Sequence, residues 1–144
     1  MKPAVVDTSV VVAGLLSANP DSPVSVILDR MLAGQIPFVL SVDLLDEYRR
    51  VLLRPKIRKR HGLTPEQIDC LLTAIVANAI IREPDRSGAA PDPGDDHLWA
   101  LLRACGNAIL VTGDLRLIEE APEFGSVVTA RRFVEMLTTP RSPT

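Results

Sequence analysis

Residues 91–114 read "PDPGDDHLWALLRACGNAILVTGD" and carry the clearest indication of the fold. An acidic cluster comes first, an apolar stretch typical of a helix follows, and a short β-branched run ends near another aspartate. A helix and a strand joined by a short connection are typical of α/β proteins. The acids at the two ends of this unit, Asp95 and Asp114, raise the question of what balances their charge.

The same alternation continues along the rest of the chain. Five short apolar runs lack the period of two that a half-exposed strand shows, so they are interpreted as parallel strands buried on both faces. Helices are predicted after Ser22 and Thr64, each followed by proline, and Gly34 and Gly106 are predicted helix ends. The order indicates right-handed βαβ crossovers and a three-layer α/β/α sandwich. The predicted strands are residues 4–7, 37–41, 79–83, 108–112 and 126–129.

Length and composition favour one soluble domain. A chain of 144 residues with 47% hydrophobic residues can bury one sizeable core. We predict a single domain over residues 1–138 and a flexible tail over 139–144. No apolar run approaches the roughly 20 residues of a membrane-spanning helix. Asp7 interrupts the apolar N-terminal run, which therefore does not resemble a signal peptide, and we expect a cytoplasmic protein.

Two candidate site residues follow predicted strands. Functional side chains in open parallel sheets gather at the carboxyl ends of strands. Asp7 follows the first strand, and Asp114 follows the fourth through Thr112 and Gly113. An acid after a strand is commonly only a helix N-cap, and for Asp114 alone this would be the favoured explanation. Both carboxylates are expected to lie at the same edge of the sheet.

Two further acids are selected by helical periodicity. In residues 44–53, Glu47 lies at the border of the apolar stripe, whereas Asp46 lies almost opposite that stripe. An acid favoured by the helix dipole explains both residues equally well. In residues 95–105, Asp95 projects toward the apolar side and Asp96 points away from it. His97 falls on the outer side, where a solvated histidine is expected.

The four acids would repel one another if they met at one sheet edge. Each pair about 5 Å apart costs roughly 3 kcal/mol at an effective dielectric near 20. We expect no lysine or arginine to neutralise the group, so a hard divalent cation is the natural counter-ion. One or two Mg²⁺ or Mn²⁺ ions suit such an oxygen-rich site and can activate water at a phosphodiester.

A local basic patch contrasts with the net charge of −2. Seven of the chain's 16 basic residues lie between positions 49 and 62. Cations at a helix end complement its dipole, and charge alone favours that interpretation. The alternative is contact with a phosphate backbone. The candidate RNA-binding residues are Arg54, Lys56, Arg58, Lys59 and Arg60.

The motifs "VVDTSV", "LLDEYRRVL" and "DPGDDHLWALLRACGNAILVTGDLRL", in this order, resemble the PIN-domain family, and especially the VapC-like ribonuclease toxins of bacterial toxin–antitoxin systems. The resemblance covers nearly the whole chain. It implies an Mg²⁺- or Mn²⁺-dependent endoribonuclease with a central, parallel, five-stranded sheet in the order 3-2-1-4-5. It also implies a small antitoxin partner, and a homodimer built from helical surface is predicted with it.

The resemblance assigns roles to particular residues. The catalytic and metal-binding candidates are Asp7, Glu47, Asp95 and Asp114, with Asp96 as an auxiliary candidate and Ser9 and Thr112 as polar support. The chain departs from the family pattern at two positions. Ser9 stands where the family often has asparagine, and Arg116 stands where it often has a second acid, which puts a second metal ion in doubt.

Two other function classes stay open. A phosphatase of the haloacid-dehalogenase type also has an aspartate after its first strand, but it requires a second acid at the position of Ser9. A PIN-like module that binds RNA or protein without catalysis is the other alternative, against which the presence of all four acids argues. Cleavage of single-stranded RNA would distinguish a nuclease from both.

Overall fold

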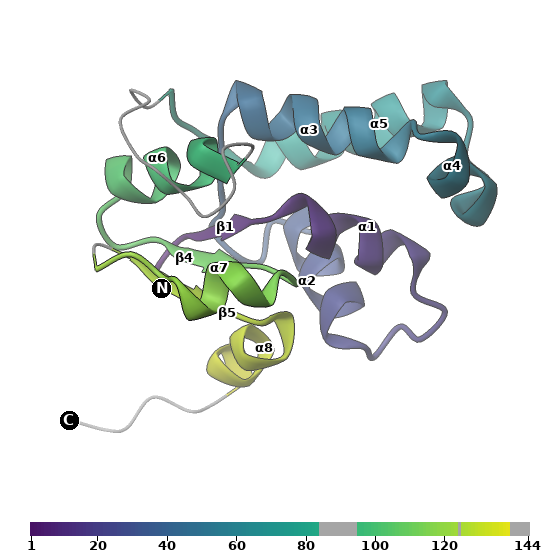
Figure 1. Ribbon diagram of the computed structural model, residues 1–144. Coiled ribbons are helices and arrows are strands. Elements are labelled where there is room, and N and C mark those ends of the chain that lie inside the picture. The colour runs from purple at the N-terminus through teal and green to yellow at the C-terminus, as the bar shows by residue number, and fades with distance from the viewer. Residues whose placement is uncertain (84–94, 124, 139–144) are drawn as a thin grey trace.

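The computed structural model describes residues 1–83, 95–123 and 125–138. The predicted tail over 139–144 lies outside the described residues. The described chain contains eight helices and five strands, and one to three helices come after each strand (Figure 1). Their bounds are β1 (Ala4–Val6), α1 (Thr8–Leu16), α2 (Pro23–Leu32), β2 (Val39–Leu40), α3 (Val42–Leu52), α4 (Pro55–His61), α5 (Pro65–Asn78), β3 (Ile80–Ile81), α6 (Asp96–Ala104), β4 (Ile109–Val111), α7 (Leu115–Glu119), β5 (Ser126–Val128) and α8 (Ala130–Thr138).

The strands form two parallel sheets rather than one continuous five-stranded sheet. β1, β4 and β5 pair in that order, with Val5 opposite Leu110, and β2 pairs with β3. Between the two sheets, Ala4 and Phe38 form one isolated parallel bridge. The α/β architecture and its parallel strands are therefore as predicted, whereas the continuous sheet is present only in part.

A buried tyrosine explains why the ladder stops between β1 and β2. The Ala4 amide donates to the Pro37 carbonyl at 2.9 Å, so it faces β2. Backbone groups alternate sides along a strand, so the Val6 carbonyl faces the same way. The fully buried Tyr48 hydroxyl donates a hydrogen bond to that carbonyl. A side chain from α3 thus occupies the place of the next ladder bond.

Helices cover the strands on both sides. In the view of Figure 1, α3, α5 and α6 lie above the strands and α8 lies below them. α1 packs against α2 and α3, while α6 packs against β1, β4 and α3. Among the described residues, the largest fully buried side chains include Tyr48, Phe38 and Met31. The core therefore lies between the strands and the helices that follow them.

The predicted helix boundaries agree with the capping geometry. Ser22 caps α2 by accepting from the Ser25 amide, and Thr64 forms a capping box with Gln67 at the start of α5. Gly34 and Gly106 follow α2 and α6 with positive φ angles of 68° and 26°. Such angles cost glycine little because it has no Cβ.

The expectation that all strands are buried on both faces was wrong for β3 and β5, neither of which has a buried residue. Ile80 and Ile81 are 38% and 49% exposed, and among the described strands β3 pairs with β2 alone. Apolar residues alone do not reveal whether a strand is central or at an edge. Within the described ranges, none of the helices combines the length and the apolar character needed to cross a membrane.

Candidate active site

Asp7 is the most buried acid of the candidate site. It follows β1 directly and is 6% exposed. Its Oδ2 atom accepts hydrogen bonds from Thr112 Oγ1 at 2.7 Å and from Ser9 Oγ at 3.1 Å. Thr112 follows β4, the neighbour of β1, so parallel pairing brings the two strand ends together. The structure therefore places both polar-support candidates against Asp7.

Asp114 follows the same strand end as Thr112. Its backbone amide donates to Thr112 Oγ1 at 3.0 Å, so one hydroxyl connects Asp7 to the Asp114 backbone. Its carboxylate caps α7 by accepting from the Arg116 amide at 3.0 Å, and the Arg116 guanidinium lies 3.8 Å from Oδ2. Asp114 is thus the helix N-cap that was the favoured interpretation of this residue alone. It also lies at the sheet edge where a site residue was expected.

Glu47 reaches this edge from α3. Its side chain is only 17% exposed, whereas Asp46 is exposed, as the position of each on the helix predicted. Thr8, the first residue of α1, donates its hydroxyl to Glu47 Oε1. His97 Nε2 lies 3.2 Å from Glu47 Oε2. Residues from α1, α3 and α6 therefore meet at one carboxylate.

The prediction that His97 is a solvated histidine was wrong. His97 is 8% exposed and contacts Glu47. The periodicity argument assumed that α6 buries one face against the strands, but α3 packs against α6 as well. A helix covered on two sides buries positions that a single apolar stripe assigns to water.

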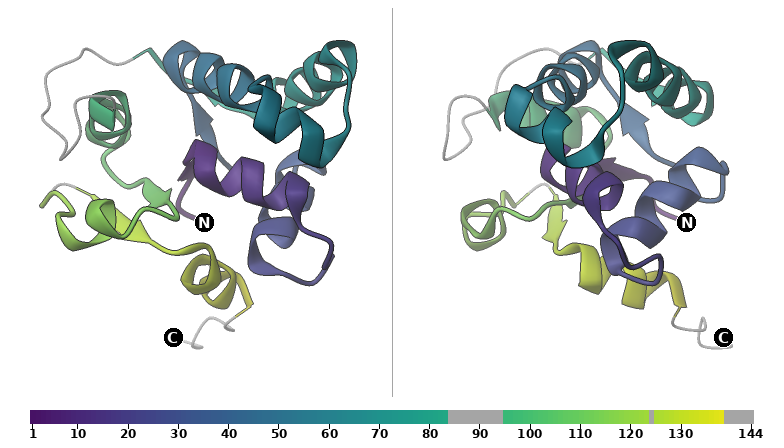
Figure 2. Two further views of the ribbon diagram at one scale, coloured as in Figure 1. Left: turned by 45° about the vertical axis from the view of Figure 1, so that its right-hand side comes forward. Right: turned by 90° about the vertical axis from the view of Figure 1, so that its right-hand side faces the viewer.

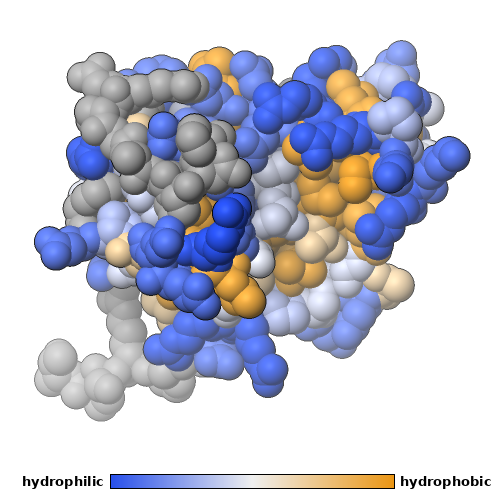
Figure 3. Space-filling model, viewed as in Figure 1, coloured by the Kyte–Doolittle hydropathy of each residue, from blue (hydrophilic) through white to orange (hydrophobic). Residues whose placement is uncertain are grey.

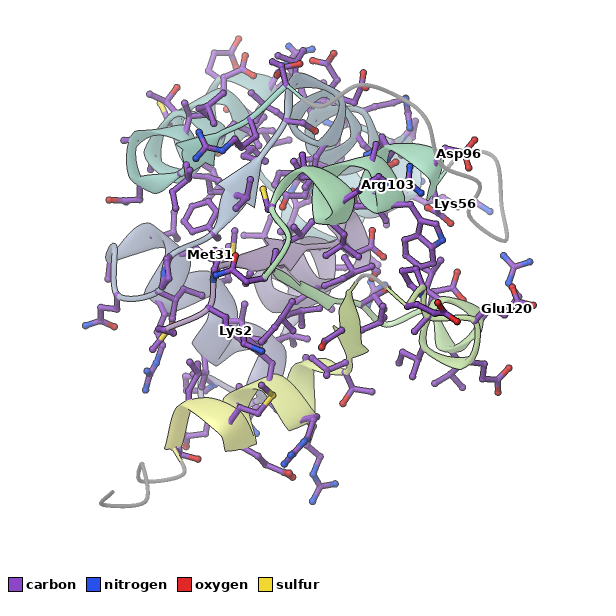
Figure 4. The ribbon with its side chains drawn as sticks, turned by 90° about the vertical axis from the view of Figure 1, so that its left-hand side faces the viewer. Lys2, Met31, Lys56, Asp96, Arg103 and Glu120 are labelled. Atoms are coloured by element: carbon purple, nitrogen blue, oxygen red, sulfur yellow. The ribbon has the colours of Figure 1, made fainter. Side chains whose placement is uncertain are left out.

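Asp95 and Asp96 stand at the start of α6. Asp95 is its N-cap and Asp96 its first residue, and both are half-buried. Figure 4 shows Asp96 at the edge of the molecule, pointing away from its body, as predicted. The contact between His97 and Glu47 brings this helix start toward the site. Among the residues that the structure describes, no three acids, histidines or cysteines are grouped closely enough to hold a metal ion as they stand.

The electrostatics separate the two acids at the centre of the site. Burial raises the pKa of Asp7, hydrogen bonds from Thr112 and Ser9 partly offset this effect, and the Glu47 charge adds to it. The hydrogen bond from His97 lowers the pKa of Glu47 against the opposing effect of burial. Burial, followed by the charges of Asp7 and Glu47, raises the pKa of Tyr48 well above its usual range. Ionised Asp7 is therefore costly as it stands. The expectation that no arginine would neutralise the acids was wrong for two of them, because Arg50 lies 3.8 Å from Glu47 and Arg116 lies 3.8 Å from Asp114.

The candidate RNA-binding residues lie mainly on α4, which buries none of its residues. α4 packs against α1 and α3, and in the right view of Figure 2 it lies toward the viewer. Three of the cations, Arg58, Lys59 and Arg60, stand in its last turn, where they also complement the helix dipole. Arg49, outside the candidate set, is paired with Asp69 at 2.9 Å.

A groove of about 370 Å³ joins α4 to the site. Ser9 and Arg60 both line the groove, and most of the other lining residues belong to α1. Figure 3 shows apolar surface surrounded by hydrophilic residues in this region. The remaining lining residues are Val12, Ala13, Leu16, Ser17 and Val51. The groove thus runs from a residue that contacts Asp7 to the basic helix.

Comparison with known proteins assigns the family. A sequence profile of the PIN domain matches residues 3–116, which include all the candidate acids. The chain belongs to the PIN domain family. PIN domains are generally nucleases and typically use divalent metal ions. No curated protein matches this chain significantly.

Another PIN domain is among the solved structures that match this chain. The PIN domain of T. brucei RRP44 is 14% identical to this chain, with a TM-score of 0.49. The alignment covers 95% of this chain and 82% of that one.

The donor chemistry of the candidate site fits a hard divalent cation. Asp7, Glu47, Asp95 and Asp114 offer only carboxylate oxygens, which Mg²⁺ and Mn²⁺ prefer. Asp7 is buried beside another negative charge, an arrangement that is costly without a counter-ion. Each Glu47 oxygen accepts one hydrogen bond and so keeps a lone pair for a metal.

Sequence reasoning missed two residues of the site, Thr8 and His97. Thr8 stands between the two residues that were selected, Asp7 and Ser9, but a threonine in the first turn of a helix is common and carries no signal of its own. His97 was assigned to the wrong side of its helix. Only the packing of α3 against α1 and α6 identifies Glu47 as their shared partner.

The raised pKa of Asp7 predicts how stability depends on pH in chelator-treated protein. The folded carboxyl binds its proton at a higher pH than the unfolded one, whose pKa is near 3.8. The cost of burying the charge is therefore present at neutral pH and is relieved as the pH falls through the folded pKa toward 3.8. Asp7→Asn should be more stable than the wild type at neutral pH, with a gap that narrows on acidification.

Urea unfolding at a series of pH values measures this gap. Glu47 has the opposite shift, so its contribution is lost on acidification, but it is present in both proteins and largely cancels. Asp29→Asn, at an exposed position of α2, is the matched control and should show no such trend. A gap that widens as the pH falls would contradict the burial argument.

Proposed function

We propose that this PIN domain is an Mg²⁺- or Mn²⁺-dependent endoribonuclease that cleaves single-stranded or structured RNA. The observation that carries the proposal is the buried Asp7 carboxylate beside the oriented Glu47 carboxylate, at the strand end that also bears Asp114. Asp95 at the start of α6 completes the proposed set, with Asp96 as an auxiliary candidate. One or two ions are expected there.

The proposed roles follow from the contacts. A bound cation would polarise the scissile phosphate and supply an activated water. Thr112 and Ser9 hold Asp7 in place through Oδ2, and Thr8 and His97 hold Glu47. Arg116, where the family often has an acid, pairs with Asp114 and so competes with a second cation there.

Asp7→Asn should abolish divalent-dependent RNA cleavage and leave the fold intact. The amide keeps the shape of the side chain but removes the negative charge through which Asp7 would hold the cation, so the water that the cation would activate is lost with it. Cleavage of a labelled single-stranded RNA, with circular dichroism as the folding check, measures the effect. Asp29→Asn is the matched control on α2.

The result also separates the alternatives. Unchanged cleavage by Asp7→Asn would refute the site assignment. RNA binding without cleavage by the wild-type chain would identify a non-catalytic PIN-like module. Turnover of a small phosphomonoester in place of RNA would identify a phosphatase.

We propose that the α4 cations hold the RNA backbone near the groove. Replacing Arg58, Lys59 and Arg60 by glutamine should weaken RNA binding and flatten its salt dependence. Each lost phosphate contact lowers the slope of log K against log salt by about 0.7 for a single strand. Arg131→Gln with Arg132→Gln on α8, where both pair with Glu135, is the control of similar charge change.

Fluorescence anisotropy at several salt concentrations measures this slope. An affinity that is indifferent to the α4 changes would return these residues to the role of a solvated helix end. Arg54 and Lys56 belong to the same proposal and are expected to add smaller losses, because they lie outside the last turn of α4.

We further propose that the protein is a cytoplasmic, homodimeric toxin restrained by a small antitoxin. A nuclease in the cytoplasm endangers the cell's own RNA, and the apolar groove beside Ser9 offers a surface that a partner would cover. An arginine of the antitoxin can pair with the site carboxylates in place of the cation. Light scattering of the purified chain and co-purification from its operon should show a dimer and a small partner; a strict monomer without one would contradict this proposal alone.

A further inference from the structure

Glu47 is held at both oxygens of its carboxylate by buried donors. Thr8 Oγ1 donates to Oε1, and His97 Nε2 lies 3.2 Å from Oε2. Thr8 is 4% exposed and His97 is 8% exposed. The donors come from α1 and α6, while Glu47 belongs to α3. Three helices therefore define the direction of one carboxylate.

Among the residues that the structure describes, the His97 ring has one hydrogen-bond partner, Glu47. Its Nδ1 atom is buried and has no hydrogen-bond partner there. A proton on Nδ1 would be buried without an acceptor, which is costly. The geometry thus favours the tautomer whose proton lies on Nε2 and is donated to Glu47.

Arg50 is a second, solvent-exposed partner toward which the Glu47 carboxylate could turn. Its Nη2 atom lies 3.8 Å from Glu47 Oε2, and its side chain is 66% exposed. A glutamate side chain has several rotatable bonds, so without buried donors its carboxylate would turn toward this guanidinium and solvent. The contacts with Thr8 and His97 hold it instead beside Asp7, whose pKa it raises in addition to the larger effect of burial.

We propose that His97, together with Thr8, is a positioning residue that presents Glu47 to a divalent cation. The proposal rests on the metal-dependent function above. Each Glu47 oxygen accepts one hydrogen bond and keeps a lone pair for a metal. Groups that hydrogen-bond to a ligating carboxylate orient it, and their loss typically weakens metal affinity about 10–100-fold.

The test compares His97→Leu with His97→Gln in the full chain. Leucine removes the donor, whereas the glutamine amide can replace Nε2. Isothermal titration with Mn²⁺ alone should show a loss of about 10–100-fold for leucine and recovery of most of the affinity for glutamine. Cleavage should follow the same order at limiting Mn²⁺, while the KM for RNA at saturating Mn²⁺ stays near that of the wild type.

Thr8→Val and Thr8→Ser provide a second, independent pair. Valine preserves the shape of threonine without the hydroxyl, and serine keeps the hydroxyl. If His97→Leu fails to fold, loss of Mn²⁺ affinity in Thr8→Val with retention in Thr8→Ser still supports the positioning of Glu47. Thermal unfolding of each variant reports whether it folds.

Several outcomes overturn the proposal. Wild-type Mn²⁺ affinity in the folded leucine or valine variant would do so. Equal losses in leucine and glutamine would identify a purely structural role, and absence of Mn²⁺ binding by the wild type would remove the basis of the proposal. A wild type that binds Mn²⁺ with the expected variant order but leaves RNA intact contradicts the proposed nuclease, not the positioning of Glu47.

Discussion

The hydrogen bond from Thr112 to Asp7 is the interaction on which the candidate site depends. It joins the ends of two neighbouring parallel strands at a buried carboxylate, 2.7 Å between Oγ1 and Oδ2. Parallel pairing of β1 with β4 sets the two residues side by side, and Thr112 Oγ1 also accepts a hydrogen bond from the Asp114 amide. One hydroxyl thus orders two of the acids, because both strands end at the same edge.

The second half of the site depends on helix packing. α3 supplies Glu47 to the site and Tyr48 to the core, and these neighbours perform different tasks. The Tyr48 hydroxyl bonds to the Val6 carbonyl, which fixes α3 over the end of β1 just before Asp7. The helix that interrupts the ladder between β1 and β2 is therefore the one that brings the second carboxylate to Asp7.

Charge is unevenly divided between the site and its surroundings. Burial of Asp7 beside Glu47 concentrates negative charge, whereas α4 concentrates positive charge at the other part of the groove. A polyanion would be repelled by the first and attracted by the second. In the proposed nuclease, the metal ion would remove the repulsion between the acids and the RNA, and the basic side chains of α4 would attract the same RNA strand.

The sequence by itself determined the α/β class, the strand positions, the capped helix starts, the place of Asp7 at a strand end and the inward side of α3 at Glu47, because hydrophobic period and local capping depend on near neighbours in the chain. It could not determine the burial of His97, the exposure of β3 or the break between the two sheets. The burial of His97 depends on α3, and the break between the sheets depends on the contact of Tyr48 with the Val6 carbonyl. The exposure of β3 depends on which elements cover the faces of the sheet. Only tertiary packing decides such contacts, since the same local pattern fits a covered and an open face.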